Sequence, residues 1–427
     1  MEALIIVAVF FICVFATVPI GFSIGLAVVI YSLVTGTVDL GFIASGLFSS
    51  CDSFPLMAIP FFILAGTLME GGGLSRRLVL FFDSLIGHKT GGLAIVTVVA
   101  CLFFGAISGS GPATTAAIGC IMVPTMVEMG YDKKFAMALV AASGCLGVII
   151  PPSIPMVMYG ISTNASISTM FMAGFLPGIL LGGLLIIVAF YYSKINGYTG
   201  NGLEFSWARV WERFKDAFWA LMVPVIILGG IYSGLFTPTE AAVISVVYGL
   251  LVGAFIYKEL DLKNLYKKFA EAGNTHGNVN IIVGTSTILG RVLILEQIPP
   301  MIANSMISLA DNKIMILILI NILLLIVGSL LETTSSILIL APILYPVAAY
   351  YGIDIIHFGI IMVVNLAIGF ITPPVGVNLF VACGIGGIPF VELVRRIVPF
   401  LIALLIGLVI ITYVPAISMT IPRLLGY

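Results

Sequence analysis

Two short polar segments interrupt long apolar stretches of this chain, and their residues could hold a cation. The first is Ser108-Gly109-Ser110-Gly111-Pro112. The second joins Gly328-Ser329 to Glu332-Thr333-Thr334-Ser335-Ser336. Hydroxyl and backbone oxygens are ligands for hard cations such as sodium, and soft ligands are scarce in both segments. The residue types therefore predict two oxygen-rich cation sites.

Each polar segment is followed by an apolar run that a double proline breaks, Pro151-Pro152 in the first case and Pro373-Pro374 in the second. A proline removes a backbone donor and disfavours helix at the residue before it, so nearby carbonyl groups need other partners. Inside a membrane, irregular backbone is tolerated only where it lines a cavity or contacts an ion. A simpler reading is that Gly, Ser, Thr and Pro only let helices pack closely. Their occurrence in two matched pairs favours the ion sites.

The composition places these segments in a membrane. Hydrophobic residues make up 61% of the 427 positions and charged residues 9%, with a mean hydropathy of +1.23. Soluble domains have a charged fraction of about a quarter. Apolar runs of about 20 residues, enough to cross the hydrocarbon layer, recur along the chain. We therefore expect an all-α integral membrane protein without a separate soluble domain.

Apolar stretches between polar breaks predict about ten full spans. Residues 92–130 and 313–350 are too long for one span and break in the middle, so each is predicted to form a re-entrant hairpin. Residues 74–88 and 299–312 are short and of mixed polarity, which predicts arms in the membrane interface. The spans are expected near residues 3–18, 20–35, 53–69, 135–160, 168–193, 217–233, 237–257, 277–298, 354–381 and 389–414.

The basic residues test this arrangement. With both hairpins non-crossing, 15 of the 18 Lys and Arg residues fall on one side, Lys313 and Arg423 fall on the other, and Arg291 lies within a span. The positive-inside rule then predicts an N-terminus on the outer side of the membrane. Making one hairpin a full crossing would mix the charges of the two sides, although two simultaneous errors could cancel.

An inverted repeat accounts for the matched features. A shift of 218 residues lays Thr114–Pro124 over Glu332–Pro342, and a double proline follows in each copy. Five predicted spans lie between the hairpins, so the copies are upside down relative to each other, as is typical of secondary transporters.

The predicted organisation is a single membrane transporter unit over residues 1–427. Its parts are first scaffold helices and an arm (1–91), a first repeat of the transport domain (92–193), scaffold helices with cytoplasmic loops (194–276), a span and a second arm (277–312), and a second repeat (313–427).

Three polar side chains outside the two segments are candidates for solute or ion binding. Arg291 is expected within a span, where an unpaired charge costs at least ~2.5 kcal/mol. Its guanidinium could grip a carboxylate with two hydrogen bonds, which makes it a candidate substrate clamp. An ion pair with Glu296 or Glu332 is an equally good reading. Asn365 and Asn378 flank the second double proline and could reach either ion or solute.

Other ionisable residues are expected to be structural. Glu70 ends a span and favours a scaffold or hinge role, and Glu240 follows Thr237 at a helix start, where threonine caps and an acid complements the helix dipole. The histidines lie near predicted interfaces, so a buried proton relay has no support. The chain has no HExxH and no GxxxxGK loop, which argues against an intramembrane enzyme and against direct use of ATP.

Several segments together resemble the large membrane subunit of TRAP transporters, the tripartite ATP-independent periplasmic carriers. The resemblance covers essentially the whole chain. Its most specific features are the Thr-Pro-Thr-Glu-Ala-Ala string and the two double-proline turns. The segments are Gly66-Thr67-Leu68-Met69, Gly105–Thr114, Ile149–Ser153, Phe236–Ala242 and Ile371–Gly376.

The resemblance implies an inverted-repeat, elevator-type transporter in the bacterial inner membrane that is coupled to two or more sodium ions. It also implies a small four-span membrane subunit and a periplasmic substrate-binding protein as partners, beside the lipid bilayer and a small anionic solute, with no nucleic acid. The chain length matches the unfused form of this subunit. Family substrates are mostly carboxylated, and the chain looks closest to the sialic-acid branch, with C4-dicarboxylates next. A binding-protein-independent sodium/dicarboxylate symporter is the alternative.

Carried over position by position, the resemblance implies a sodium site at each polar segment and a solute site between them. The sodium residues would be Ser108, Gly109, Ser110, Gly144, Gly147 and Pro151 in the first half, and Gly328, Ser329, Thr333, Thr334, Gly369, Thr372 and Pro373 in the second. The solute residues would be Thr114, Thr115, Ser153, Ser335, Ser336, Pro374 and Asn378, with Arg291 as the clamp proposed above.

Overall fold

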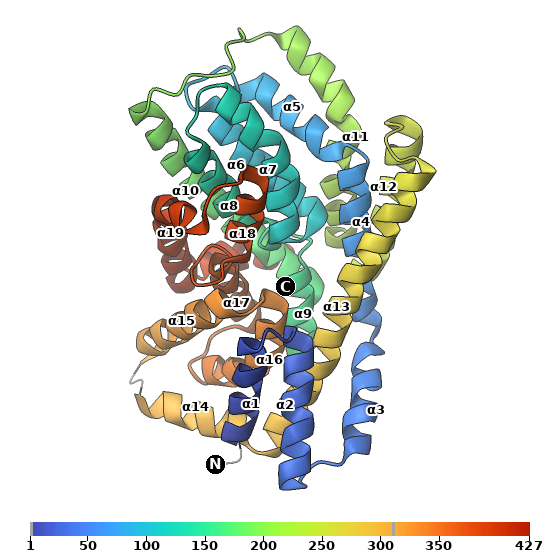
Figure 1. Cartoon of the computed structure of the whole chain (residues 1–427), viewed down its shortest axis with the longest axis vertical. Helices are drawn as coiled ribbons and strands as arrows, with labels where there is room; N and C mark the ends of the chain where they lie inside the picture. The colour runs from blue at the N-terminus through green and yellow to red at the C-terminus, as the bar shows by residue number, and fades with distance from the viewer. Residues whose placement is uncertain (1–2, 310–311) are drawn as a thin grey trace.

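The computed structural model describes residues 3–309 and 312–427, and within them the chain forms helices without strands (Figure 1). One set, the scaffold group, is α1 (Ala3–Phe15), α2 (Ile20–Thr35), α3 (Leu40–Cys51), the 3₁₀ turn η1 (Phe54–Met57), α4 (Ala58–Gly71), α11 (Trp207–Tyr232), α12 (Pro238–Leu251), the π turn η3 (Val252–Ile256) and α13 (Leu262–Leu295). The other set, the hairpin group, is α6 (Gly92–Ser108), α7 (Gly111–Glu128), α8 (Lys133–Gly144), the 3₁₀ turn η2 (Cys145–Val148), α9 (Ile154–Thr163), α10 (Ile167–Ile195), α15 (Lys313–Leu330), α16 (Thr333–Tyr350), α17 (Ile355–Gly369), α18 (Val377–Gly386), α19 (Phe390–Tyr413) and α20 (Ala416–Leu424).

Two further helices connect the groups, α5 (Leu74–Ile86) and α14 (Ile298–Leu309), and each immediately precedes a hairpin. Arg77 of α5 is tied to the scaffold group, because its Nε donates to Asp216 at 3.1 Å and its Nη1 donates to Glu259 at 2.6 Å. Burial raises the pKa of Asp83, and two hydrogen bonds from Asn201 act in the opposite direction. The polar face of α5 is therefore anchored at the end of the molecule that carries loop 196–206.

The helix boundaries correct the starts of two expected spans and add two helices that were not expected. Among the described residues, 8 helices are long and apolar enough to cross a membrane. Helix α13 begins at Leu262 instead of near residue 277, because a polar, lysine-bearing segment continues the same helix. Likewise α11 begins at Trp207 instead of near 217. Helices α3 and α20 were not expected, and α3 has 12 residues, about 18 Å at 1.5 Å per residue, too short to span alone.

The first hairpin, α6 and α7, opens at the end of the molecule where α19 begins. Its two free ends lie together, since Gly91 N–H donates to the Tyr198 carbonyl at 3.3 Å and Tyr131 O–H donates to the Thr199 carbonyl at 3.2 Å. Just after the hairpin, Lys134 pairs with Glu392, in the first turn of α19, at 2.6 Å.

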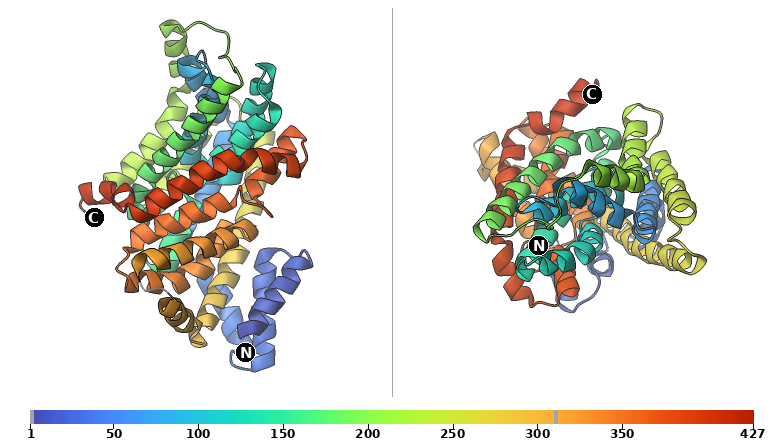
Figure 2. Two further views of the ribbon diagram at one scale, coloured as in Figure 1. Left: turned by 90° about the vertical axis from the view of Figure 1, so that its left-hand side faces the viewer. Right: turned by 90° about the horizontal axis from the view of Figure 1, so that it is seen from above.

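The second hairpin, α15 and α16, opens at the opposite end of α19. There Tyr413, the last residue of that helix, donates to the Ile314 carbonyl at 3.3 Å. Helices α15, α17 and α19 run side by side (Figure 2). The two hairpins therefore point toward each other from opposite ends of one long helix, which confirms the inverted repeat.

Local capping explains two acidic residues. Thr237 and Glu240 form a reciprocal capping box at the start of α12, with Glu240 N–H donating to Thr237 Oγ1 at 3.3 Å and Thr237 N–H donating to Glu240 at 2.8 Å. Glu70, at the end of α4, pairs with Lys268 of α13 at 3.2 Å. Both residues thus have the structural roles that the sequence predicted.

Candidate ion and solute site

The tip of the first hairpin lies against the first double-proline break. Gly109 has a φ of +60°, which lets the chain turn between α6 and α7, and its carbonyl accepts from Ile154 N–H at 3.4 Å. The hydroxyls of the tip bind one another, since Ser108 Oγ lies 2.9 Å from Thr114 Oγ1, which donates to the Ser110 carbonyl at 2.8 Å. The tip is thus a compact cluster of oxygens.

Glycines make this contact possible. A Cβ at Gly147 would lie 2.3 Å from Thr114 Oγ1 and 2.7 Å from the Ser110 carbonyl, and one at Gly144 would lie 1.9 Å from Thr115 Oγ1. The end of α8 and the turn η2 therefore approach the start of α7 more closely than they could if positions 144 and 147 carried a residue other than glycine. Residues 144 and 147 expose backbone to the tip instead of side chains.

The second tip repeats this geometry with a different cap. Glu332 caps α16, accepting from Thr334 Oγ1 at 2.8 Å and from Ser335 N–H at 3.3 Å. The corresponding cap of α7 is the uncharged Ser110, which accepts from Ala113 N–H at 3.5 Å. The second tip therefore carries a carboxylate where the first has a hydroxyl.

The second tip also lies against its own break. Val375 N–H donates to the Ser329 carbonyl at 3.2 Å, and a Cβ at Gly369 would lie 2.3 Å from the carbonyl of Gly328. The two breaks differ in burial, because Pro151 and Pro152 are buried whereas Pro373 and Pro374 are exposed. Both breaks contain a cis proline bond.

Each broken helix continues onto the hairpin of the other repeat. Helix α18 packs on α7 and α8, where Asn378 Nδ2 donates to the Ala141 carbonyl at 3.1 Å, and α9 packs on α16. As a result, the N-termini of α7, α9, α16 and α18 and the C-termini of α6, α8, α15 and α17 all lie at the two tips and their breaks. Helix N-termini favour anions and helix C-termini favour cations.

The structure places every predicted site residue except Arg291 at a tip or at a break. In the first half these are Ser108, Gly109, Ser110, Thr114, Thr115, Gly144, Gly147, Pro151 and Ser153. In the second half they are Gly328, Ser329, Thr333, Thr334, Ser335, Ser336, Gly369, Thr372, Pro373, Pro374 and Asn378. Ser153 caps α9 and is 0% exposed.

Arg291 lies elsewhere, on the part of α13 that packs on α3. Its side chain is exposed, and one guanidinium nitrogen would lie 3.5 Å from a Cβ added at Gly46 of α3. No ion pair joins it to Glu296 or Glu332 among the described residues. The geometry therefore supports neither the clamp nor the predicted pairing.

Replacing Arg291 with glutamine should leave the solute concentration at half-maximal uptake within about twofold of wild type, because the guanidinium contacts neither tip. Uptake into liposomes, measured across a range of solute concentrations, checks this. A tenfold or larger rise would show that α13 brings Arg291 to the solute during transport, and membrane abundance measured in parallel separates a loss of assembly.

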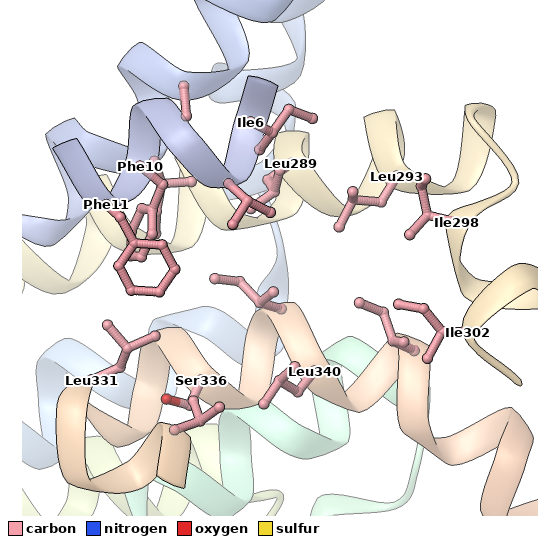
Figure 3. A pocket seen from close by; sticks show the side chains of 16 residues that line it. Ile6, Phe10, Phe11, Leu289, Leu293, Ile298, Ile302, Leu331, Ser336 and Leu340 are labelled. Atoms are coloured by element: carbon pink, nitrogen blue, oxygen red, sulfur yellow. The ribbon is translucent and has the colours of Figure 1, made fainter. Parts of the chain in front are cut away.

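One apolar cavity borders the second tip but is unsuited to an anion. It has a volume of about 300 Å³ and is lined by α1, α2, α13, α14, α15, α16 and Leu331 between the last two (Figure 3). Ser336 is the single hydroxyl residue of its lining, and that hydroxyl donates to the Glu332 carbonyl at 3.0 Å. Ser336 thus lies at the boundary between this cavity and the second tip.

Several buried oxygens near the tips have no hydrogen-bond partner among the described residues. They are Ser143 Oγ, Thr333 Oγ1, Ser335 Oγ, Asn365 Oδ1 and Asn378 Oδ1. Three of these residues were predicted to bind ion or solute, and Asn365 was considered for it. Ser143 was not predicted, although its position four residues before Gly147 matches that of Asn365 before Gly369.

One of the three histidines is buried within the protein. His357 is 2% exposed and lies inside the hairpin group, with Nδ1 2.7 Å from Ser418 Oγ and Nε2 3.3 Å from the Thr412 carbonyl. It is buried because α20, which was not expected, covers the start of α17. Both ring nitrogens have partners, so the histidine is held in place by α19 and α20.

The fold and the paired sites define an inverted-repeat membrane carrier. A family model described as "Tripartite ATP-independent periplasmic transporter, DctM component" matches residues 7–417. The chain therefore belongs to the TRAP transporter family as its large, DctM, component.

Named relatives agree with this family and are transporter permeases. The isethionate TRAP transporter permease protein DctMQ of Oleidesulfovibrio alaskensis is 48% identical over 402 residues, covering 94% of this chain and 63% of that protein. The C4-dicarboxylate large permease DctM of Rhodobacter capsulatus is 40% identical over the full length of both chains. The sialic acid large permease SiaM of Vibrio cholerae is 38% identical over 97% of each chain.

A solved structure shares the fold at low sequence identity. The Alcanivorax borkumensis YdaH transporter, whose topology is described as unusual, superposes with a TM-score of 0.62 over 87% of this chain and 86% of that one. The sequence identity is 14%, so the likeness concerns the fold alone.

Proposed function

We propose that the chain carries a small organic anion across the bacterial inner membrane together with sodium. The supporting observation is the meeting of four helix N-termini with four helix C-termini at the two tips. The N-termini suit the carboxylate of a solute, and the C-termini with their hydroxyls and freed carbonyls suit sodium.

The solute is proposed to carry a carboxylate or a related acidic group. The relatives are named for isethionate, C4-dicarboxylates, sialic acid and 2,3-diketo-L-gulonate, which are all small anions. The sequence favoured sialic acid. Sialic acid and a C4-dicarboxylate are therefore the first two solutes to test, and isethionate is the third because of the 48% identity of that relative.

We further propose an elevator movement and two partners. The hairpin group would slide against the scaffold group while α5 and α14 hold the two together. A small membrane subunit and a periplasmic binding protein would complete the transporter, as the fused name DctMQ of one relative suggests for the small subunit. The concentration of basic residues on one predicted side supports a periplasmic N-terminus.

Uptake into liposomes tests the proposal, with one component omitted at a time. The full chain and a small TRAP membrane subunit are reconstituted together, and sodium, binding protein and radiolabelled solute are varied. We expect uptake only when all are present and only with sodium outside. Unchanged uptake in potassium buffer would refute sodium coupling, and uptake without binding protein would favour a sodium/dicarboxylate symporter.

A further inference from the structure

The apolar cavity beside the second tip, which we call the apolar slot, has two walls that belong to different groups of helices. Figure 3 shows Ile6 and Leu289 of the scaffold group on one wall. Ser336 and Leu340 of α16, in the hairpin group, lie on the opposite wall. An occupant of the slot would therefore contact both groups at once.

The slot is elongated. In Figure 3, Phe11 and Leu331 lie at one end, and Ile298 and Ile302 of α14 lie at the other. The slot therefore extends along α16 toward the arm α14. This shape suits an extended chain better than a compact molecule.

The chemistry of the lining excludes water and favours hydrocarbon. A buried water needs two to four polar partners. The one hydroxyl in the lining, that of Ser336, already donates to the Glu332 carbonyl at 3.0 Å. A dry apolar cavity of about 150 Å³ takes up benzene, and the slot has a volume of about 300 Å³. Left empty, it would deprive both walls of van der Waals contacts, so an apolar occupant is stabilising.

The slot opens toward the bilayer along α1. Val7 and Phe11 of that helix line the slot and are 53% and 41% exposed, whereas Ile24 and Ala27 of α2 line it and are 0% exposed. Helix α1 contains no charged residue, and its exposed side is expected to face lipid. The slot is therefore continuous with the hydrocarbon layer, and a lipid chain can enter it while its head group stays in the interface.

We propose that one acyl chain of a bilayer phospholipid occupies the slot and acts as a flexible spacer between α2 and α16. The two walls slide past each other in the proposed elevator movement, so the spacer role rests on the proposed function. A flexible chain can bend or withdraw as the walls move, which keeps both walls in apolar contact. Because α16 begins at the second tip, the occupant acts on the hairpin that carries Glu332.

Photo-crosslinking tests whether the slot is occupied. The chain is placed in nanodiscs, with and without a small TRAP membrane subunit, and the nanodiscs contain phosphatidylcholine with a diazirine on one acyl chain. After irradiation, mass spectrometry maps the residues that carry lipid. We expect adducts on the buried wall residues Ala27 and Leu289 in both samples. Ile187 of α10, which is 65% exposed, gives the level for bulk lipid, and Val363 of α17, which is 0% exposed, gives the background.

Filling the slot tests both occupancy and the spacer role. Ala27→Phe places a ring in the slot, so Leu289 should lose most of its labelling. Initial uptake into liposomes should fall at least about tenfold, because a ring fixed to α2 overpacks the slot when α16 moves. Ala27→Leu fills the slot only in part and should give intermediate labelling and uptake, which keeps the test valid if the larger ring prevents folding. Leu33→Phe adds the same ring at a 65% exposed position of α2 outside the slot and should leave both measurements unchanged.

Four results would contradict the proposal. Labelling of Leu289 at the Val363 level in the wild-type protein would show that no acyl chain enters. Loss of that labelling on addition of the small subunit would assign the slot to a segment of that subunit. Equal labelling of Leu289 in the wild-type protein and in Ala27→Phe would place the adduct outside the slot. Lost labelling with unchanged uptake in Ala27→Phe would refute the spacer role.

The two readouts also separate this inference from the proposed function. Labelling does not require solute transport. Absence of sodium-driven uptake by the wild-type protein would refute the proposed function and the spacer role with it, whereas adducts on Leu289 would still establish the acyl-chain site.

Discussion

Replacing Gly369 with alanine should reduce solute uptake at least about 30-fold, because the new methyl group would overlap the main chain of the second hairpin. Its Cβ would lie 2.3 Å from the carbonyl carbon and oxygen of Gly328. Neither neighbour is a side chain that can rotate away, so α15 and α17 must move apart. Overpacking of this kind costs about 1–3 kcal/mol, and ~2 kcal/mol corresponds to the stated factor. Initial uptake rates in liposomes, normalised to reconstituted protein, measure it.

Alanine substitutions at two other glycines should reduce uptake less, or not at all. A Cβ at Gly328 would lie 3.2 Å from Leu366, so Gly328→Ala should reduce uptake by a smaller factor. Gly384 of α18 has nothing within 4 Å of an added Cβ, and Gly384→Ala should keep full uptake. Alanine also stabilises an exposed helix relative to glycine. Equal uptake by the Gly369 and Gly384 variants would show that the tip does not need its contact with the break.

Replacing Glu332 with glutamine should raise the sodium concentration needed for half-maximal uptake by about 30-fold or more. Glutamine keeps an oxygen that can accept from Ser335 N–H, as Glu332 does at 3.3 Å, but it removes the negative charge. A cation about 8 Å from a carboxylate gains ~2 kcal/mol at an effective dielectric constant near 20. The loss of that attraction accounts for the expected shift, which a sodium titration of uptake records.

Alanine at the same position separates charge from capping. Glu332→Ala also removes the cap of α16 and should lower the melting temperature further, since loss of a cap costs about 1 kcal/mol. Glu240 is the matched control, because it stands at the start of α12 and helps cap it. Glu240→Gln should leave the sodium curve unchanged. If Glu332→Gln did so too, the carboxylate would be only a helix cap.

The paired features of the site could be predicted because they are visible in composition. Double prolines and clusters of Gly, Ser and Thr stand out in an apolar chain, since each disrupts a membrane helix in a chemically specific way. The inverted orientation followed from the five predicted spans between the hairpins, and the distribution of basic residues tested that count without any knowledge of packing. Hairpins, breaks and arms were therefore placed to within a few residues.

Other features depend on packing that a single sequence does not display. The residue type of Arg291 suggested a clamp. What its side chain can reach is decided by its position on α13 relative to α3, which the sequence does not show. Ser143 is one serine in an apolar helix, and nothing but the symmetry of the fold relates it to Asn365. The predicted start of α13 lies 15 residues after its actual start at Leu262. The first part of the helix is polar, and a polar segment can continue a helix that an apolar segment follows.

The two repeats share one backbone arrangement but differ in side chains and in burial. One break is buried and faces a hydroxyl cap, and the other is exposed and faces a carboxylate cap. If the two halves were identical, they would present the same surface to the solute. In this structure the first break is enclosed by protein and the second is not, so the two halves are unequal in their surroundings although their backbones match. Interchanging them would require each half to take the surroundings of the other, without a change in its own shape.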